Sequence, residues 1–164
     1  MISVRMRTAA AVALVGLVGS LSMTTPGAVA ADSEAAEEAG PWGPVGVWTG
    51  TVQHAEGSGP VTLSFTLGGK VCLTSGGGEG GGGEGEGTWH STGGNTFSYQ
   101  VVERLFAEDG ETVGWVHVDQ QAQQQAHSVQ SSGMSEVFGA DGTPWGTVEA
   151  TVSVTRTGWL PNCS

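Results

Sequence analysis

Strict alternation of apolar and polar residues is the feature that most restricts how this chain can fold. It is clearest over residues 60–67 (PVTLSFTL) and again over 144–157 (PWGTVEATVSVTRT). A period of two places every second side chain on the same face of an extended strand. The chain is therefore expected to build an all-β fold in which one face of each strand is buried.

The chain contains eight such strand-like runs, most of them joined by short turns. Gly68-Gly69, Gly93-Gly94-Asn95 and Ala140-Asp141-Gly142-Thr143 are typical hairpin turns. Little of the chain shows helical periodicity. We therefore predict one domain over residues 45–164, an eight-stranded antiparallel up-and-down β-barrel, in which closure removes exposed strand edges. The alternative is a β-sandwich, which would need long connections between its sheets.

The first 44 residues have a different character. A basic start (Arg5, Arg7), a short apolar run over 8–21 and the small residues Ala28-Val29-Ala30 follow the order of a secretory signal peptide. We predict that residues 1–30 are removed by cleavage near Ala30 and that the protein is secreted. Residues 31–44 are acidic and lack a hydrophobic face, so we expect a disordered lead-in.

The charge balance limits the possible partners. Of the 164 residues, 16 are Asp or Glu and 5 are Lys or Arg, which gives a formal net charge of −11 at pH 7. An acidic protein of this kind repels nucleic acids and anionic lipid headgroups. We therefore expect no nucleic-acid binding. Because no second apolar run follows the N-terminal one, we also expect no membrane insertion.

Residues 75–87 (SGGGEGGGGEGEG) form a glycine-rich segment that we expect to be a flexible loop, because glycine at this density holds a single conformation only at high entropic cost. The chain has two cysteines, Cys72, which lies shortly before this segment, and Cys163. An even cysteine count in an exported protein predicts one disulfide. Alternation places Cys72 on the outside of its strand, where the C-terminal tail could reach it.

The inward faces of the predicted strands supply the candidate ligand-binding residues. Glu103 is the most informative of them, because it lies on the apolar face of its strand, where a carboxylate is costly unless it is paired or protonated. It either serves as a ligand anchor or acid/base, or lies at the barrel mouth, or pairs with Arg104 or Arg156. The full set of candidates is Phe65, Trp89, Phe97, Tyr99, Glu103 and Gln120.

No motif predicts a catalytic centre, a cofactor or a metal. Ser131-Ser132-Gly133 lacks the Gly-x-Ser-x-Gly pattern of the hydrolase nucleophile elbow. His117 and Asp119 share one face of a strand, but the sequence suggests no third ligand for them. We therefore expect no cofactor, and a binding protein is favoured over an enzyme.

Gly46-Val47-Trp48 begins the first predicted strand, and Arg156 is near the end of the last one. In these positions the chain resembles the calycin superfamily, the lipocalins and their relatives, which carry Gly-x-Trp in the first strand and an Arg near the end of the last. The resemblance implies that Arg156 packs over Trp48 and closes the barrel floor, and that a disulfide ties the C-terminal tail to the barrel. No helix is predicted after the last strand, unlike in the lipocalins.

The layout is also similar to small bacterial eight-stranded barrels, including those like allene oxide cyclase and spirotetronate cyclase. Three functions follow from these resemblances and from the inward-facing set. The barrel could bind a small apolar molecule, act as a fully packed structural or interaction module, or act as a cyclase or isomerase using Glu103 or Tyr99. The first is favoured.

Overall fold

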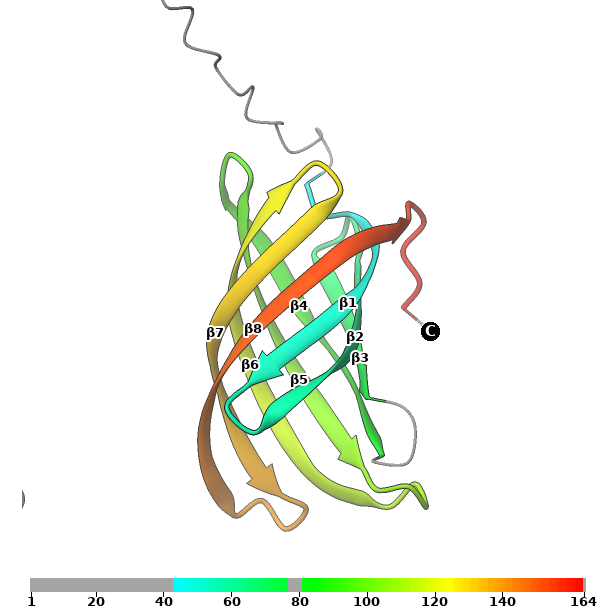
Figure 1. Ribbon diagram of the computed structural model, residues 1–164. Helices are drawn as coiled ribbons and strands as arrows, with labels where there is room; N and C mark the ends of the chain where they lie inside the picture. Colours follow the sequence, from blue (N-terminus) through cyan, green and yellow to red (C-terminus); the bar gives the residue numbers. More distant parts are fainter. Residues whose placement is uncertain (1–42, 77–80, 164) are drawn as a thin grey trace, which may run out of the picture. The chain divides into compact units, whose positions relative to one another are not determined.

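The computed structural model describes residues 43–76 and 81–163, and these form a closed barrel of eight strands (Figure 1). Each strand pairs antiparallel with the next, and β8 returns to pair with β1. The predicted eight-stranded up-and-down barrel is confirmed, and the β-sandwich alternative is wrong. The strands are β1 (Gly46–His54), β2 (Gly57–Phe65), β3 (Lys70–Gly76), β4 (Gly82–Gly93), β5 (Thr96–Phe106), β6 (Thr112–Gln125), β7 (Ser128–Gly139) and β8 (Pro144–Gly158).

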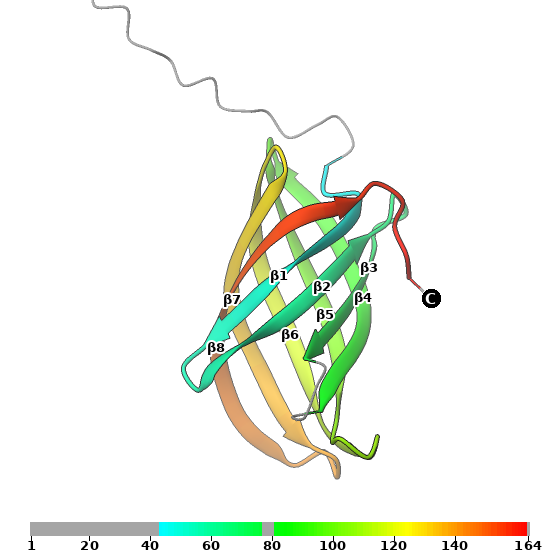
Figure 2. The same cartoon turned by 45° about the vertical axis from the view of Figure 1, so that its right-hand side comes forward.

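The predicted signal peptide and nearly all of the lead-in lie outside the described residues. Within the described part of the chain, no helix is long and apolar enough to cross a membrane. The chain enters the barrel at β1 and leaves after β8 at the same end, which is the upper end in Figures 1 and 2. The β2–β3, β4–β5 and β6–β7 turns share that end, and the β1–β2, β5–β6 and β7–β8 turns lie at the opposite one.

Strand β4 begins earlier than the sequence suggested. Of the flexible loop expected over 75–87, residues 77–80 lie outside the described residues, and most of the remainder is strand, because β3 continues to Gly76 and β4 starts at Gly82. Glycine fills the inner face of β4 because β5 lies very close to it: a Cβ at Gly85 or Gly87 would overlap the β5 backbone. The outward neighbours are Glu84 and Glu86.

The aromatic core occupies the end at which the chain enters and leaves. Phe65 makes edge-to-face contacts with Trp89, Phe97 and Tyr99, at ring-centroid distances of 6.2, 5.3 and 5.6 Å. Such pairs add to the stabilisation that comes from burying the rings. This end of the barrel is filled with side chains, and we call it the closed half.

Arg156 covers the floor of the closed half. Its guanidinium lies 4.0 Å from the centre of the Trp48 ring and 4.2 Å from that of Trp159, so it is held between two indoles. Nη1 donates a hydrogen bond to the carbonyl of Val45, and the Trp48 indole donates to that of Pro44 at 2.6 Å. Burial lowers the pKa of Arg156.

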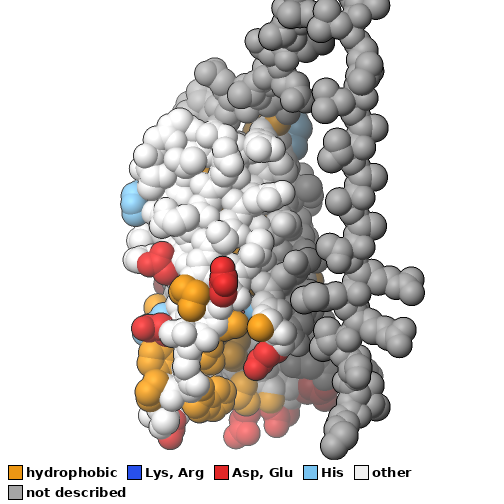
Figure 3. All heavy atoms as spheres, turned by 60° about the vertical axis from the view of Figure 1, so that its left-hand side comes forward, with side chains coloured by type: hydrophobic (Ala, Val, Ile, Leu, Met, Phe, Trp, Pro, Cys, Tyr) orange, Lys and Arg blue, Asp and Glu red, His pale blue; other side chains and the backbone are white. Residues whose placement is uncertain are grey.

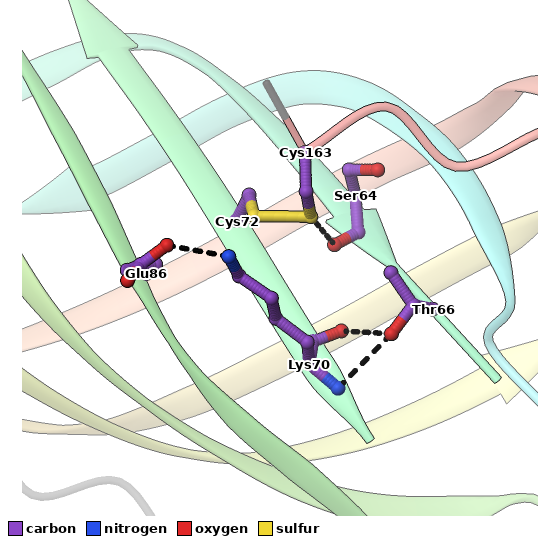
Figure 4. A network of polar contacts seen from close by, with 6 residues as sticks. All are labelled: Ser64, Thr66, Lys70, Cys72, Glu86 and Cys163. Carbon is purple, nitrogen blue, oxygen red and sulfur yellow. Dashed lines mark hydrogen bonds and ion pairs between the residues drawn. A yellow bond between two sulfur atoms is a disulfide. The ribbon is translucent and has the colours of Figure 1, made fainter. Parts of the chain in front are cut away.

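The predicted disulfide between Cys72 and Cys163 is confirmed, and it joins β3 to the tail that follows β8 (Figure 4). The two cysteines are 91 residues apart in sequence, with their Cα atoms 5.5 Å apart. The backbone N–H of Asn162 donates to the Ser64 hydroxyl at 2.7 Å, which holds the tail against β2 as well. Beside the disulfide, Lys70 forms an exposed ion pair with Glu86 at 2.6 Å.

Candidate ligand cavity

The opposite end of the barrel encloses a cavity of about 540 Å³. The cavity extends from the β1–β2 turn (His54, Ala55, Glu56) inward to Tyr99 and Gln120. We call this end the open half. A volume in the range of roughly 300–1,000 Å³ is typical of sites for small molecules.

The walls of the cavity are mostly aliphatic. They come from the inward faces of all the strands except β4, because the β4 face there is glycine. The aliphatic lining residues are Val52, Val61, Leu73, Leu105, Val116, Val118, Val137, Val148, Ala150 and Val152. Several of them are only partly buried, among them Val116, Val118 and Val148. Since these side chains lack packing partners on one side, their apolar surface is available to a ligand.

Glu103 projects from β5 into this cavity and is 7% exposed. The Ser75 hydroxyl on β3 donates a hydrogen bond to its Oε1. The carboxyl group reaches across the inner face of β4 because position 83 is glycine, and a Cβ there would overlap Oε1. Burial raises the pKa of Glu103 above its ordinary value of 4.5, and the hydrogen bond from Ser75 opposes that rise.

A chain of hydrogen bonds crosses the inner end of the cavity. The Ser131 hydroxyl donates to Gln120 Oε1 at 3.0 Å and lies 2.9 Å from the Tyr99 hydroxyl. Because the single hydroxyl proton of Ser131 goes to Gln120, the Tyr99 hydroxyl donates to Ser131. Burial raises the pKa of Tyr99 to about 12, so its phenol stays neutral at physiological pH.

Trp145 stands at the cavity mouth. It is 64% exposed, and its ring packs against the inward-facing glycines Gly114 and Gly139. The register between β7 and β8 shifts between Val137 and Phe138, and Gly146 has a φ of +136°. This irregularity turns Trp145 toward the mouth, where its indole is available to stack on a bound molecule.

The six residues proposed from the sequence divide between the two halves of the barrel. Glu103, Tyr99 and Gln120 line the cavity. Phe65, Trp89 and Phe97 pack against one another in the closed half and are not part of the cavity lining. The ion pairs considered for Glu103 are also not formed: Arg104 pairs with Glu84 at 2.7 Å on the outside, and Arg156 lies on the floor.

Sequence reasoning missed Ser75, Ser135 and Trp145, all of which line the cavity. Ser75 fell in the segment expected to be a loop, although it continues the alternation of Val71 and Leu73. Trp145 lies between Pro144 and Gly146, two residues that break a strand pattern. No sequence signal indicated that its ring would turn toward the mouth.

A second hollow, of about 840 Å³, lies on the outer face of β4 to β8. Val102 and Met134 are exposed in it, and Glu86, Asp119 and Glu136 also line it. On the face shown in Figure 3, hydrophobic side chains gather toward the lower end, with acidic side chains among and around them. This hollow is wider than the cavity but is not enclosed by a barrel wall, so we regard the interior cavity as the better binding site.

In residues 43–76 and 81–163, no three His, Cys, Asp or Glu side chains come together as metal ligands. His117 packs against Phe138 with ring centroids 4.8 Å apart, and Asp119 accepts a hydrogen bond from Gln100 at 2.8 Å.

The chain matches no protein-family model, no curated protein and no solved structure. Its function therefore has to be inferred from the barrel itself.

Proposed function

We propose that this protein is a secreted, lipocalin-like barrel that binds a small, largely apolar molecule in its open half. The observation that carries the proposal is the cavity of about 540 Å³ with an aliphatic wall and few polar groups. Removing apolar ligand surface from water contributes about 25 cal/mol per Å², and a preformed cavity lowers the entropic cost of binding.

The cavity argues against the fully packed interaction module. A barrel that served only as a structural unit would gain stability by filling its interior, since empty space forfeits dispersion contacts. Here the closed half is filled and the open half is not. The Cys72–Cys163 disulfide supports an extracellular location, because such bonds persist in oxidising compartments.

The proposal is tested by titrating the protein with Nile red, a neutral apolar dye whose emission rises in apolar surroundings. We expect saturable binding, with one dye per barrel, by the wild-type protein. Ala150→Phe places a large ring in the cavity wall and is expected to weaken binding at least tenfold. Val102→Phe on the outer face is the matched control. Equal binding by the wild type and Ala150→Phe would place the dye elsewhere and contradict the proposal.

Native mass spectrometry of the protein recovered from its own culture medium tests the same proposal without a chosen probe. A co-purifying small molecule that is lost in Ala150→Phe is the expected result.

N-terminal sequencing of that material tests secretion, with Ala31 expected as the first residue. Protein retained in the cell with Met1 intact would contradict it.

A further inference from the structure

The described residues that line the cavity include the buried carboxyl group of Glu103 and no Lys or Arg. Its titratable lining residues are Tyr99, Glu103 and, at the exposed rim, His54 and Glu56. The three Lys and Arg residues in the described part of the chain all lie elsewhere. Lys70 and Arg104 form exposed ion pairs on the outside, and Arg156 lies between two indoles on the floor of the closed half.

Glu103 is only partly satisfied by the protein. Among the described residues it has one hydrogen bond, the one that Ser75 donates to Oε1. The Glu103 side chain lines the cavity, so a bound molecule can reach its carboxyl group. A largely buried carboxylate is costly unless an opposite charge or further donors accompany it.

A bound cation would remove this cost, and a bound anion would increase it. An opposite charge within about 4–6 Å favours the ionised form of a carboxyl group, whereas a like charge disfavours it. The whole chain carries a formal net charge of −11, which also favours the approach of a cation over that of an anion. Trp145 adds an exposed indole there, whose face attracts a cation.

Building on the proposed function, we infer that the ligand is an amphiphilic amine, whose ammonium group pairs with Glu103 and whose apolar body lies against the valine-rich wall. The ammonium group donates to Oε2 of Glu103, while Ser75 keeps its bond to Oε1. Tyr99 and Gln120 satisfy each other through Ser131 and form the inner end of the site.

The inference is tested with three ligands that share one tail and differ in the head group: dodecylamine, 1-dodecanol and dodecanoate. Each displaces Nile red from the full-length protein at pH 7 and below its micelle concentration. We expect the amine to bind at least tenfold more tightly than the alcohol, and dodecanoate to bind most weakly. If the alcohol equals or exceeds the amine, the inference fails and the proposed function stands. If none of the three displaces the dye, both fail.

Glu103→Gln separates the carboxylate from the rest of the site, because the amide keeps the size of the side chain and still accepts from Ser75. We expect the affinity for dodecylamine to fall at least tenfold and that for 1-dodecanol to change less than threefold. Glu136→Gln on the outer face is the matched control, with less than a twofold change for the amine. An equal loss of amine affinity in both variants would reduce the effect to net charge and overturn the inference.

The wild-type protein gives a test that does not depend on folding of a variant. Lowering the pH through the raised pKa of Glu103 protonates the carboxyl group and is expected to weaken amine binding, with little change for the alcohol. His54 and Glu56 also line the cavity, at its rim, so the experiment is repeated with His54→Gln and Glu56→Gln. A pH dependence lost in either of these variants would assign the effect to the rim and overturn the inference.

Discussion

The two halves of this barrel are built from the same eight strands, but one is filled with side chains and the other contains a cavity. In the closed half, Trp48, Phe65 and Phe97 are almost fully buried, and Arg156 covers the floor between two indoles. In the open half, the inward side chains are mostly small and aliphatic, and they leave a cavity into which the Glu103 carboxyl group projects. The difference shows that side-chain volume, rather than strand pairing, decides which end of such a barrel is available to a ligand.

The largest expected effect on stability comes from removing a tryptophan from the closed half, and removing one from the open half is the comparison. We expect Trp48→Ala to lower the free energy of unfolding by about 3–5 kcal/mol, as for other large-to-small core changes. Arg156→Ala loses contacts with two indoles and should cost about 1–4 kcal/mol. Trp145→Ala, at the mouth, should cost less than about 1 kcal/mol. Urea denaturation measures all three, and similar losses for the two tryptophans would remove the distinction between the halves.

The disulfide gives the next largest effect. The chain-entropy model assigns about 4–5 kcal/mol to a crosslink closing a loop of this length, and engineered or native cases typically give about 2–4 kcal/mol. Replacing Cys72 and Cys163 together by Ser should therefore lower the free energy of unfolding by about 2–5 kcal/mol. Because the bond lies outside the barrel wall, Nile red affinity should change less than threefold. A large loss of affinity at a temperature where the variant is folded would show that the halves are coupled.

Filling the open half should have a smaller effect on stability than emptying the closed half. Ala150→Phe is expected to change the free energy of unfolding by less than about 2 kcal/mol, since the cavity has room for the ring. The same variant should lose Nile red binding. Thermal melts alongside the dye titration check both expectations. A loss of stability as large as that of Trp48→Ala would mean that the cavity is already filled in solution.

The smallest expected effect concerns Glu103 and pH in the absence of ligand. Its pKa in the folded protein is raised above 4.5, so its contribution to stability is fully present below about pH 4.5 and is lost as the pH rises through the raised pKa. Glu103→Gln avoids that loss. We expect its melting temperature to match that of the wild type near pH 4 and to exceed it at pH 8, whereas Glu136→Gln should show no such trend. A lower melting temperature at pH 8 would contradict the sign.

The sequence predicted the closed half better than the open half. Alternation assigned the eight strands and the inward faces of β2, β5 and β8, because each strand carries large apolar residues on one side. Alternation misassigned the start of β4, because glycine occupies the inward positions there and only the outward residues Glu84 and Glu86 follow a period of two. The division of the six candidate residues between a packed core and a cavity depends on strand register. Register is set by pairings such as Gly85 with Glu103, which no single strand reveals.

The shared location of the two ends of the described chain has a practical consequence. Gly43 lies against the Trp89 ring and Cys163 is bonded to Cys72, so both lie beside the closed half, whereas the cavity mouth is at the other end of the barrel. A fluorophore, affinity tag or surface linker added after the last strand would therefore be carried away from the mouth. The barrel could be immobilised through its tail with the mouth facing solution, which is the orientation that a sensor for small molecules requires.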